Sequence, residues 1–257
     1  MIGKICMHSC CRQAALALLI IGLPAAARAA SISYPPVGPL PPGYTFTNIV
    51  ESSVTDGVPL YGAPSPIVVG LGFTPTPTFS AASTNGGADI TDGQLNFTVT
   101  AVPSAGGIPQ INVSEGGLFT LLGPGTGATQ VLAGAIIRAT VVEINGVPVS
   151  PFSLTPVSAS VNYNVVTSPG MDQDWSLNLT LNVASQLGLL GFGPNDRATK
   201  ADVVIDNSLV ALSQLQTEAR ISKTDFDITI FVPEPGSISL LGLALCGLAA
   251  GRKRLGC

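Results

Sequence analysis

Charged residues are scarce in this 257-residue chain, at 10% of the sequence, and aromatic residues make up only 5%. An ordinary soluble domain carries about 25% charged residues. This shortage excludes a coiled coil, a bundle of long surface helices and a charge-rich disordered chain, because each of these needs abundant charge. Glycine (29 residues) and proline (21 residues) are plentiful instead, and the chain is long enough to bury a sizeable core.

Histidine and cysteine are both absent between residues 30 and 233. The one histidine and the five cysteines lie in the two terminal segments: His8, Cys6, Cys10, Cys11, Cys246 and Cys257. The middle of the chain therefore cannot hold a disulfide scaffold, a zinc site built from Cys or His, a cysteine nucleophile or a Ser-His-Asp triad. No cofactor is predicted for it.

Positive charge is also scarce in the middle of the chain. Residues 30–233 carry 14 acidic and five basic side chains, a net charge of −9, compared with −4 for the whole sequence. Such a segment repels phosphate groups, so neither nucleic acid nor anionic lipid is a predicted partner.

The first 29 residues have the pattern of a secretory signal peptide. Lys4 and Arg12 precede an uncharged apolar run at 14–23, and small residues follow it. Cleavage is predicted after Ala29, with Ala27 as the near alternative. Signal peptidase and Sec-type export machinery are therefore expected partners.

Three features lie close together at the other end of the chain. Pro233, Glu234 and Pro235 are followed by an uncharged apolar run at 238–250 and then by a basic cluster of Arg252, Lys253 and Arg254. The two prolines keep the intervening glutamate in an extended, accessible backbone. As a helix, residues 238–251 would span about 21 Å, which is shorter than a ~30 Å hydrocarbon core, so any anchoring in the membrane is predicted to be weak or temporary. The basic cluster is expected to stay cytoplasmic.

This arrangement resembles the PEP-CTERM sorting domain, which combines a Val-Pro-Glu-Pro box, a short transmembrane stretch and a terminal basic cluster. The match covers residues 232–254, and only the last three residues, Leu255 to Cys257, depart from it. The resemblance implies that exosortase recognises Pro233, Glu234 and Pro235 and removes the tail. It further implies a Gram-negative-type bacterium, transient anchoring in the inner membrane, and delivery to the cell surface, outer membrane or extracellular matrix.

The middle segment alternates between apolar and polar residues with a period of two. Residues 95–101, 157–165 and 175–183 each place apolar side chains at every second position and Thr, Ser or Asn between them. This pattern is typical of strands with one buried and one solvated face. Asn145-Gly146 between two apolar runs predicts a β-hairpin. We therefore expect an all-β exported domain at 30–231, an antiparallel β-sandwich or jelly roll, between the signal helix and a C-terminal sorting tail at 232–257.

Weaker patterns complete the expected fold. Five prolines at 31–43 favour polyproline II or an extended edge segment over a ladder strand. The stretch 192–226 predicts a closing pair of strands, and 183–190 a short helical turn. Further strands are expected at 44–50, 108–113, 118–122, 203–205, 220–223 and 226–232.

Two acidic pairs are candidate calcium ligands. Asp172 with Asp174, and Asp89 with Asp92, place carboxylates close together in sequence, although Asp is also an ordinary turn former. Two carboxylates could also serve a glycoside hydrolase, but no local motif selects a pair. Trp175 starts an alternating apolar face, so packing in the core is favoured over sugar stacking.

The sequence as a whole favours a non-enzymatic exported surface or matrix protein. The role that the family resemblance implies is structural or adhesive, in exopolysaccharide or biofilm, with exopolysaccharide as a candidate partner. The alternatives are a lectin-like glycan-binding module, with or without Ca²⁺, and a carboxylate-dependent glycoside hydrolase.

Overall fold

The structure is a computed structural model that describes residues 30–102 and 105–231. The predicted cleavage positions Ala27 and Ala29, the Pro233–Pro235 box and the basic cluster Arg252–Arg254 lie outside the described residues. Within the described part of the chain, no helix is both long enough and apolar enough to cross a membrane.

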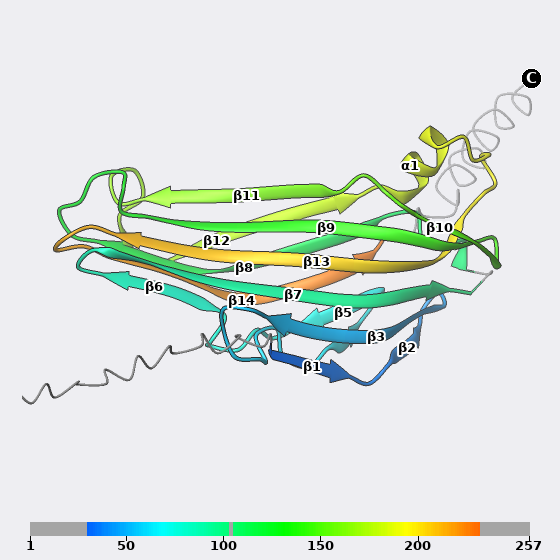
Figure 1. Cartoon of the computed structure of the whole chain (residues 1–257), viewed down its shortest axis with the longest axis horizontal. Helices are drawn as coiled ribbons and strands as arrows, with labels where there is room; N and C mark the ends of the chain where they lie inside the picture. Colours follow the sequence, from blue (N-terminus) through cyan, green and yellow to red (C-terminus); the bar gives the residue numbers. More distant parts are fainter. Residues whose placement is uncertain (1–29, 103–104, 232–257) are drawn as a thin grey trace, which may run out of the picture.

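The described residues form two antiparallel β-sheets that face each other, with the strands running along the long axis of the molecule (Figure 1). The first sheet has eight strands, in which β3, β7, β13 and β9 are central, β1 and β2 pair with β3, and β10 and β11 pair with β9. Its strands are β1 (Ala30–Tyr34), β2 (Val37–Leu40), β3 (Tyr44–Ser53), β7 (Gly87–Ala101), β13 (Ala198–Ser213), β9 (Gln130–Ile144), β10 (Val147–Ser153) and β11 (Val157–Asn164).

The second sheet has six strands. The order is β12, β8, β14, β5 and β4, and β6 also pairs with β14. Its strands are β12 (Gly170–Leu181), β8 (Ile111–Leu122), β14 (Glu218–Ile230), β5 (Gly70–Phe73), β4 (Ser65–Ile67) and β6 (Ser80–Thr84). The predicted all-β fold of antiparallel sheets is confirmed.

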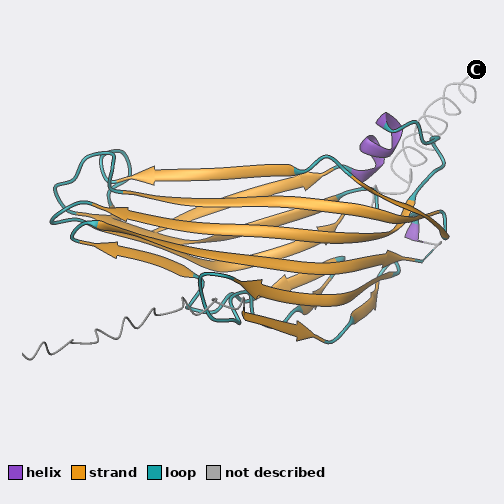
Figure 2. Cartoon of the chain, in the orientation of Figure 1, coloured by secondary structure: helices purple, strands orange, loops and turns teal. Residues whose placement is uncertain are grey.

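Among the described residues, one short α-helix interrupts the strands (Figure 2). Helix α1 (Val183–Leu189) begins after Asn182, whose side-chain oxygen accepts a hydrogen bond from the Ser185 backbone N–H. Asparagine is a favoured residue at this capping position. The predicted helical turn is confirmed.

Alternating side chains build the core between the sheets. In β13 every second residue from Ala201 to Ser213 is buried, and the residues between them are partly or largely exposed. Trp175 is 3% exposed, and its indole Nε1 donates a hydrogen bond to the Ser222 carbonyl at 2.9 Å. The predicted core role of Trp175 is confirmed.

The predicted hairpin at Asn145-Gly146 joins β9 and β10. Both turn residues have positive φ values, 51° for Asn145 and 79° for Gly146. This is the conformation that the tight turn between two right-twisted strands requires, and Asn-Gly adopts it at low cost.

Several strands are longer than the sequence indicated. The predicted strands at 108–113 and 118–122 form one strand, β8, which continues through Gly116 and Gly117. Gly117 is not a break, because the backbone of the neighbouring strand β14 lies very close beside it. A Cβ atom there would lie well inside 3.0 Å of the Ser222 carbonyl oxygen, a distance that real Cβ atoms essentially never show. Likewise, the strands predicted at 220–223 and from 226 onward form one strand, β14, which ends at Ile230, and the strand predicted at 203–205 extends into β13.

Two topological predictions need correction. The proline-rich segment 31–43 lies at an edge of the eight-stranded sheet, as predicted, but it forms ladder strands there, since β1 and β2 both pair with β3. The predicted closing pair in 192–226 does not pair with itself: β13 is central in one sheet and β14 is central in the other. Each finds its partners far away in sequence, which local patterns do not reveal.

Candidate functional site

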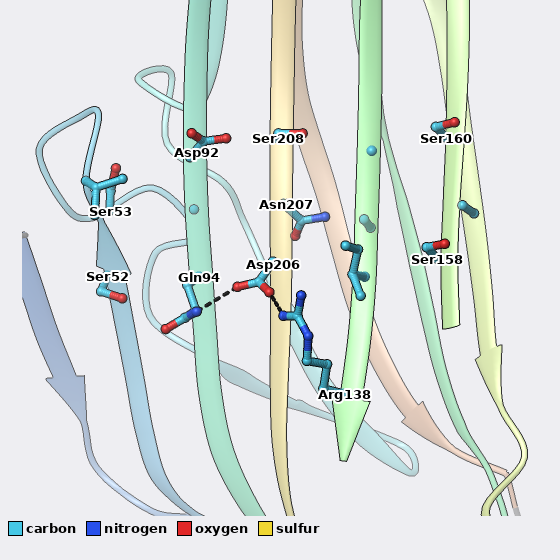
Figure 3. Close-up of a pocket in the computed structure, with 16 residues that line it drawn as sticks. Ser52, Ser53, Asp92, Gln94, Arg138, Ser158, Ser160, Asp206, Asn207 and Ser208 are labelled. Carbon is cyan, nitrogen blue, oxygen red and sulfur yellow. Dashed lines mark hydrogen bonds and ion pairs between the residues drawn. The ribbon is translucent and has the colours of Figure 1, made fainter. Parts of the chain in front are cut away.

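A shallow hollow of about 860 Å³ lies on the outer face of the eight-stranded sheet (Figure 3). Its lining comes from β3, β7, β13, β9 and β11 and from Val54, which follows β3. Period-two alternation explains its position, because the positions between the core residues of five neighbouring strands all point to this face.

The strand register arranges the lining in two cross-strand rows. One row runs across five strands, and the next runs across four. The first consists of Ser52, Gln94, Asp206, Ile136 and Ser158; the second consists of Asp92, Ser208, Gly134 and Ser160.

Gly134 leaves the second row without a side chain at its centre. A Cβ atom placed there would meet only ordinary contacts, the nearest being Ser208 Oγ at 3.5 Å. The glycine is therefore not forced by a clash. Its missing side chain contributes open space to the hollow.

Asp206 is the electrostatic centre of the first row. Its carboxylate accepts a hydrogen bond from Gln94 Nε2 at 2.7 Å and forms an ion pair with Arg138 (Figure 3). The Arg138 side chain is 47% exposed. An exposed pair of this kind adds little stability, typically below about 1 kcal/mol. The pair does orient the guanidinium, which keeps further N–H donors for a ligand.

Asp92 in the second row is partly withdrawn from water. Burial raises its pKa above the ordinary value, and the nearby charge of Asp56 raises it further. Thr55 connects the two residues, because its hydroxyl donates to Asp56 Oδ2 at 2.6 Å and accepts from the Asp92 backbone N–H at 2.8 Å.

The hollow presents hydroxyl, amide, carboxylate and guanidinium groups on the outer face of the sheet. No aromatic, His or Cys side chain is among its lining residues. The arrangement is suited to hydrogen bonding with a polyhydroxylated ligand, by side chains that both donate and accept. It offers no ring on which a sugar could stack and no nucleophile paired with a base.

Neither acidic pair named from the sequence is joined by a third metal-ligating side chain within the described residues. Asp89 and Asp92 point to opposite faces of β7, because β7 keeps an unshifted register with β13. Asp89 instead accepts a hydrogen bond from the Ala82 backbone N–H at 2.7 Å. Asp172 lies at an irregularity in β12, with φ 48°, and interacts with Thr120 rather than with a second acid. No group of three metal-ligating side chains occurs within residues 30–102 and 105–231.

Sequence reasoning missed Gln94, Arg138 and Asp206. Each lies at an outward position of an alternating strand, so its exposure could have been read from the pattern. The sequence pattern could not show that these three side chains lie close together, because β7, β9 and β13 become neighbours only through long-range pairing.

The chain matches no protein-family model and no curated protein. Among solved structures it is similar to TmCBM61 in complex with β-1,4-galactotriose, at 7% identity and a TM-score of 0.25 over 70% of this chain and 82% of that one. It is also similar to the family 11 xylanase from Neocallimastix patriciarum, at 7% identity and a TM-score of 0.20 over 79% and 100% of the two chains. A third similarity is to infectious bursal disease virus, Gx strain, at 13% identity and a TM-score of 0.17 over 81% and 60%. TM-scores this low do not establish a shared fold, so the function is inferred from the chain's own residues.

Proposed function

We propose that the chain is a non-enzymatic, exported adhesive protein of the bacterial surface or matrix, and that it binds polysaccharide through the hollow on the eight-stranded sheet. The observation that supports binding is the hollow itself, where polar side chains from five strands gather on one open face. An open sheet face admits an extended chain, and serine hydroxyls, Asp206 and Arg138 match the hydrogen-bonding groups of sugars.

The binding proposal is tested with two matched arginine variants. Arg138 pairs with Asp206 in the hollow, and Arg220 pairs with Glu218 on the outer face of the other sheet, with the Arg220 side chain 60% exposed. We expect Arg138→Ala to weaken binding about tenfold or more, because a hydrogen bond to a charged group contributes about 1.5–3 kcal/mol. Arg220→Ala should bind like the unchanged protein.

The probes are an immobilised β-glucan, a β-galactan, a mannan and the exopolysaccharide of the producing bacterium. Binding is measured with and without a chelator, and we expect the chelator to have no effect. Equal loss in both variants, or no binding to any of the four probes, would contradict the hollow as the binding site.

Delivery to the surface is the second part of the proposal. The support for it is the sequence at 232–254, where the Pro-Glu-Pro box, the apolar run and the basic cluster follow one another, together with the leader at 1–29. We propose that exosortase cleaves this tail after export, so that the acidic β-sandwich is released from the inner membrane.

The sorting step is tested by mass. In a bacterium that carries exosortase, the mature wild-type protein is compared with a variant in which Pro233, Glu234 and Pro235 are all replaced by alanine. We expect the wild type to lack the basic cluster and the variant to retain it. Equal masses that both include Arg252–Arg254 would refute sorting at this box.

The proposal of a non-enzymatic role has its own test. A broad panel of glycosides and esters should show no turnover with the purified chain. Turnover that disappears when one acid of the hollow is changed, as in Asp92→Asn, would point to the glycoside hydrolase alternative.

A further inference from the structure

A charged pair lies in the apolar space between the two sheets. Lys223 Nζ on β14 and Glu115 Oε2 on β8 are 2.6 Å apart, and both side chains are 0% exposed. The second carboxylate oxygen, Glu115 Oε1, is buried without a hydrogen-bond partner. A buried ion pair with an unpaired oxygen is costly compared with an apolar pair, so stability alone does not explain it.

A third side chain reaches the pair from the opposite sheet. Asn207 on β13 donates a hydrogen bond from Nδ2 to the same oxygen, Glu115 Oε2, at 2.7 Å. Because one oxygen holds both nitrogens, Lys223 Nζ and Asn207 Nδ2 lie no more than 5.3 Å apart, the sum of the two distances. An amine, a carboxamide and a carboxylic group therefore meet at one buried point.

Burial favours an uncharged, nucleophilic amine at Lys223, and it outweighs the attraction of the surrounding aromatic faces for an ammonium. Lys223 Nζ lies 4.6 Å from the ring centre of Phe79, 5.0 Å from Phe226 and 5.7 Å from Tyr61. Burial lowers the pKa of Lys223, and the charge and hydrogen bond of Glu115 only partly oppose this. A desolvated lysine amine in an apolar pocket is an activated nucleophile.

Hydrogen bonds at both ends of the Asn207 carboxamide fix its position. Its Nδ2 donates to Glu115, and its Oδ1 lies 2.8 Å from the Tyr61 hydroxyl. The single hydrogen of this hydroxyl is shared with the Gly93 carbonyl, at 3.0 Å. Burial raises the pKa of Tyr61, so the hydroxyl keeps its hydrogen. Such a donor stabilises the negative charge that develops on a carbonyl oxygen during attack.

Glu51 positions Tyr61 for this role. Its buried carboxylate accepts hydrogen bonds from the backbone N–H groups of Leu60 and Tyr61, and from the Tyr34 hydroxyl at 2.7 Å. The segment after β3 is thereby fixed against the core, which directs the Tyr61 ring between the sheets.

We propose that Lys223 and Asn207 join in an intramolecular isopeptide bond, with Glu115 as the group that transfers protons. The Lys223 ammonium first gives a proton to Glu115. The neutral Nζ then attacks Asn207 Cγ, and a C–N bond forms. Glu115 moves a proton from Nζ to Nδ2, the Cγ–Nδ2 bond breaks, and ammonia leaves. The products are an amide, ammonia and the protonated acid of Glu115, so atoms and charge balance without an oxidant or any other reactant.

The bond would join the two sheets through their central strands. β13 and β14 lie in different sheets, and the described domain contains no cysteine, so no disulfide can fasten them. An amide has the same topological effect and resists reducing agents. For a protein exposed outside the cell, the cross-link would oppose unfolding and proteolysis.

The test is peptide mapping of the full wild-type chain after denaturation, reduction and trypsin digestion. Trypsin cleaves after Lys200 and Arg220, and also after Lys223 when its amine is free. We expect a branched peptide in which 201–220 is attached to Lys223, lighter than its two parts by one ammonia, about 17 Da, with no cleavage at Lys223.

Three variants separate this outcome from other modifications. Asn207→Asp should still form the link but lose water, about 18 Da, in place of ammonia. Lys223→Arg and Glu115→Gln should give only linear peptides. A wild-type digest cleaved fully at Lys223 would overturn the proposal, as would an ammonia loss confined to the linear peptide 201–220, which indicates a local succinimide. Because the wild-type map shows the branched peptide or its absence directly, the test holds even if a variant fails to fold.

Discussion

Replacing glycine by alanine is expected to lower the stability of the protein at one position in the middle of the sandwich, Gly117, and to raise it at another, Gly134. Gly117 on β8 faces the backbone of β14, and the added Cβ would clash with the Ser222 carbonyl oxygen. Gly134 on β9 faces the hollow, and the added Cβ would meet Ser208 Oγ at an ordinary 3.5 Å. The two positions therefore form a matched pair.

The sizes of the two effects follow from these contacts. To clear the Cβ at Gly117, β14 must retreat by roughly 1 Å, which stretches ladder hydrogen bonds beyond their normal 2.7–3.2 Å. Losing two or three such bonds, at about 1 kcal/mol each, lowers the free energy of unfolding by about 3 kcal/mol. At Gly134 the alanine restricts the conformations of the unfolded chain, so it should raise the free energy of unfolding by about 0.5–1 kcal/mol.

Urea unfolding of the two variants measures this difference. With a slope of about 2 kcal/mol per M, the two midpoints should differ by about 2 M, with Gly117→Ala lower and Gly134→Ala at or above the wild type. Equal midpoints would refute the close approach of β8 and β14 at this point. The Gly134→Ala protein should also bind polysaccharide more weakly, because the methyl group occupies part of the hollow.

Three further predictions concern single groups. Burial raises the pKa of Tyr44 from 10.0 to about 12, and it also raises the pKa values of Tyr34 and Tyr61. The unfolded state therefore loses these protons first, and the stability that the protonated tyrosines contribute is lost as pH rises above about 10. Parallel alkaline titrations of tyrosinate absorbance and circular dichroism should show ionisation and unfolding together. The raised pKa of Asp92 means that the folded state binds this proton more tightly than the unfolded state does, so ionisation of Asp92 lowers stability at pH values above its ordinary pKa of 3.8. The Asp92→Asn variant should therefore unfold at a higher urea concentration than the wild type at pH 7, and the difference between the two midpoints should close near pH 4. Replacing Asn182 by alanine removes the cap of α1 and should cost about 1 kcal/mol in the same urea assay, whereas Asn182→Asp should be close to neutral.

The local part of the fold could be predicted because it depends on neighbours in sequence. The alternation at 175–183 located a strand with Trp175 on its buried face, and Asn145-Gly146 located a hairpin. Both patterns follow from chain geometry over a few residues. The predicted signal peptide and sorting tail stay predictions, since they lie outside the described residues.

The long-range part could not be predicted. Nothing within 192–226 indicates that its two strands belong to different sheets, because β13 pairs with β7 and β14 pairs with β8, each of which lies roughly a hundred residues earlier. Gly116-Gly117 has the composition of a turn, yet in β8 these glycines permit the close approach of another backbone. Lys223 and Glu115 are 108 positions apart and were two ordinary charged residues in the sequence.

The division of β13 into an inward and an outward set of side chains has an evolutionary consequence. The side chains of Asp206 and Ser208 point to the hollow, while those of Ile205, Asn207 and Leu209 are buried. Substitutions can therefore accumulate on the outward set and alter ligand preference without disturbing the interior. Related chains, or a library randomised only at outward positions of the central strands, should diversify in specificity while keeping one scaffold.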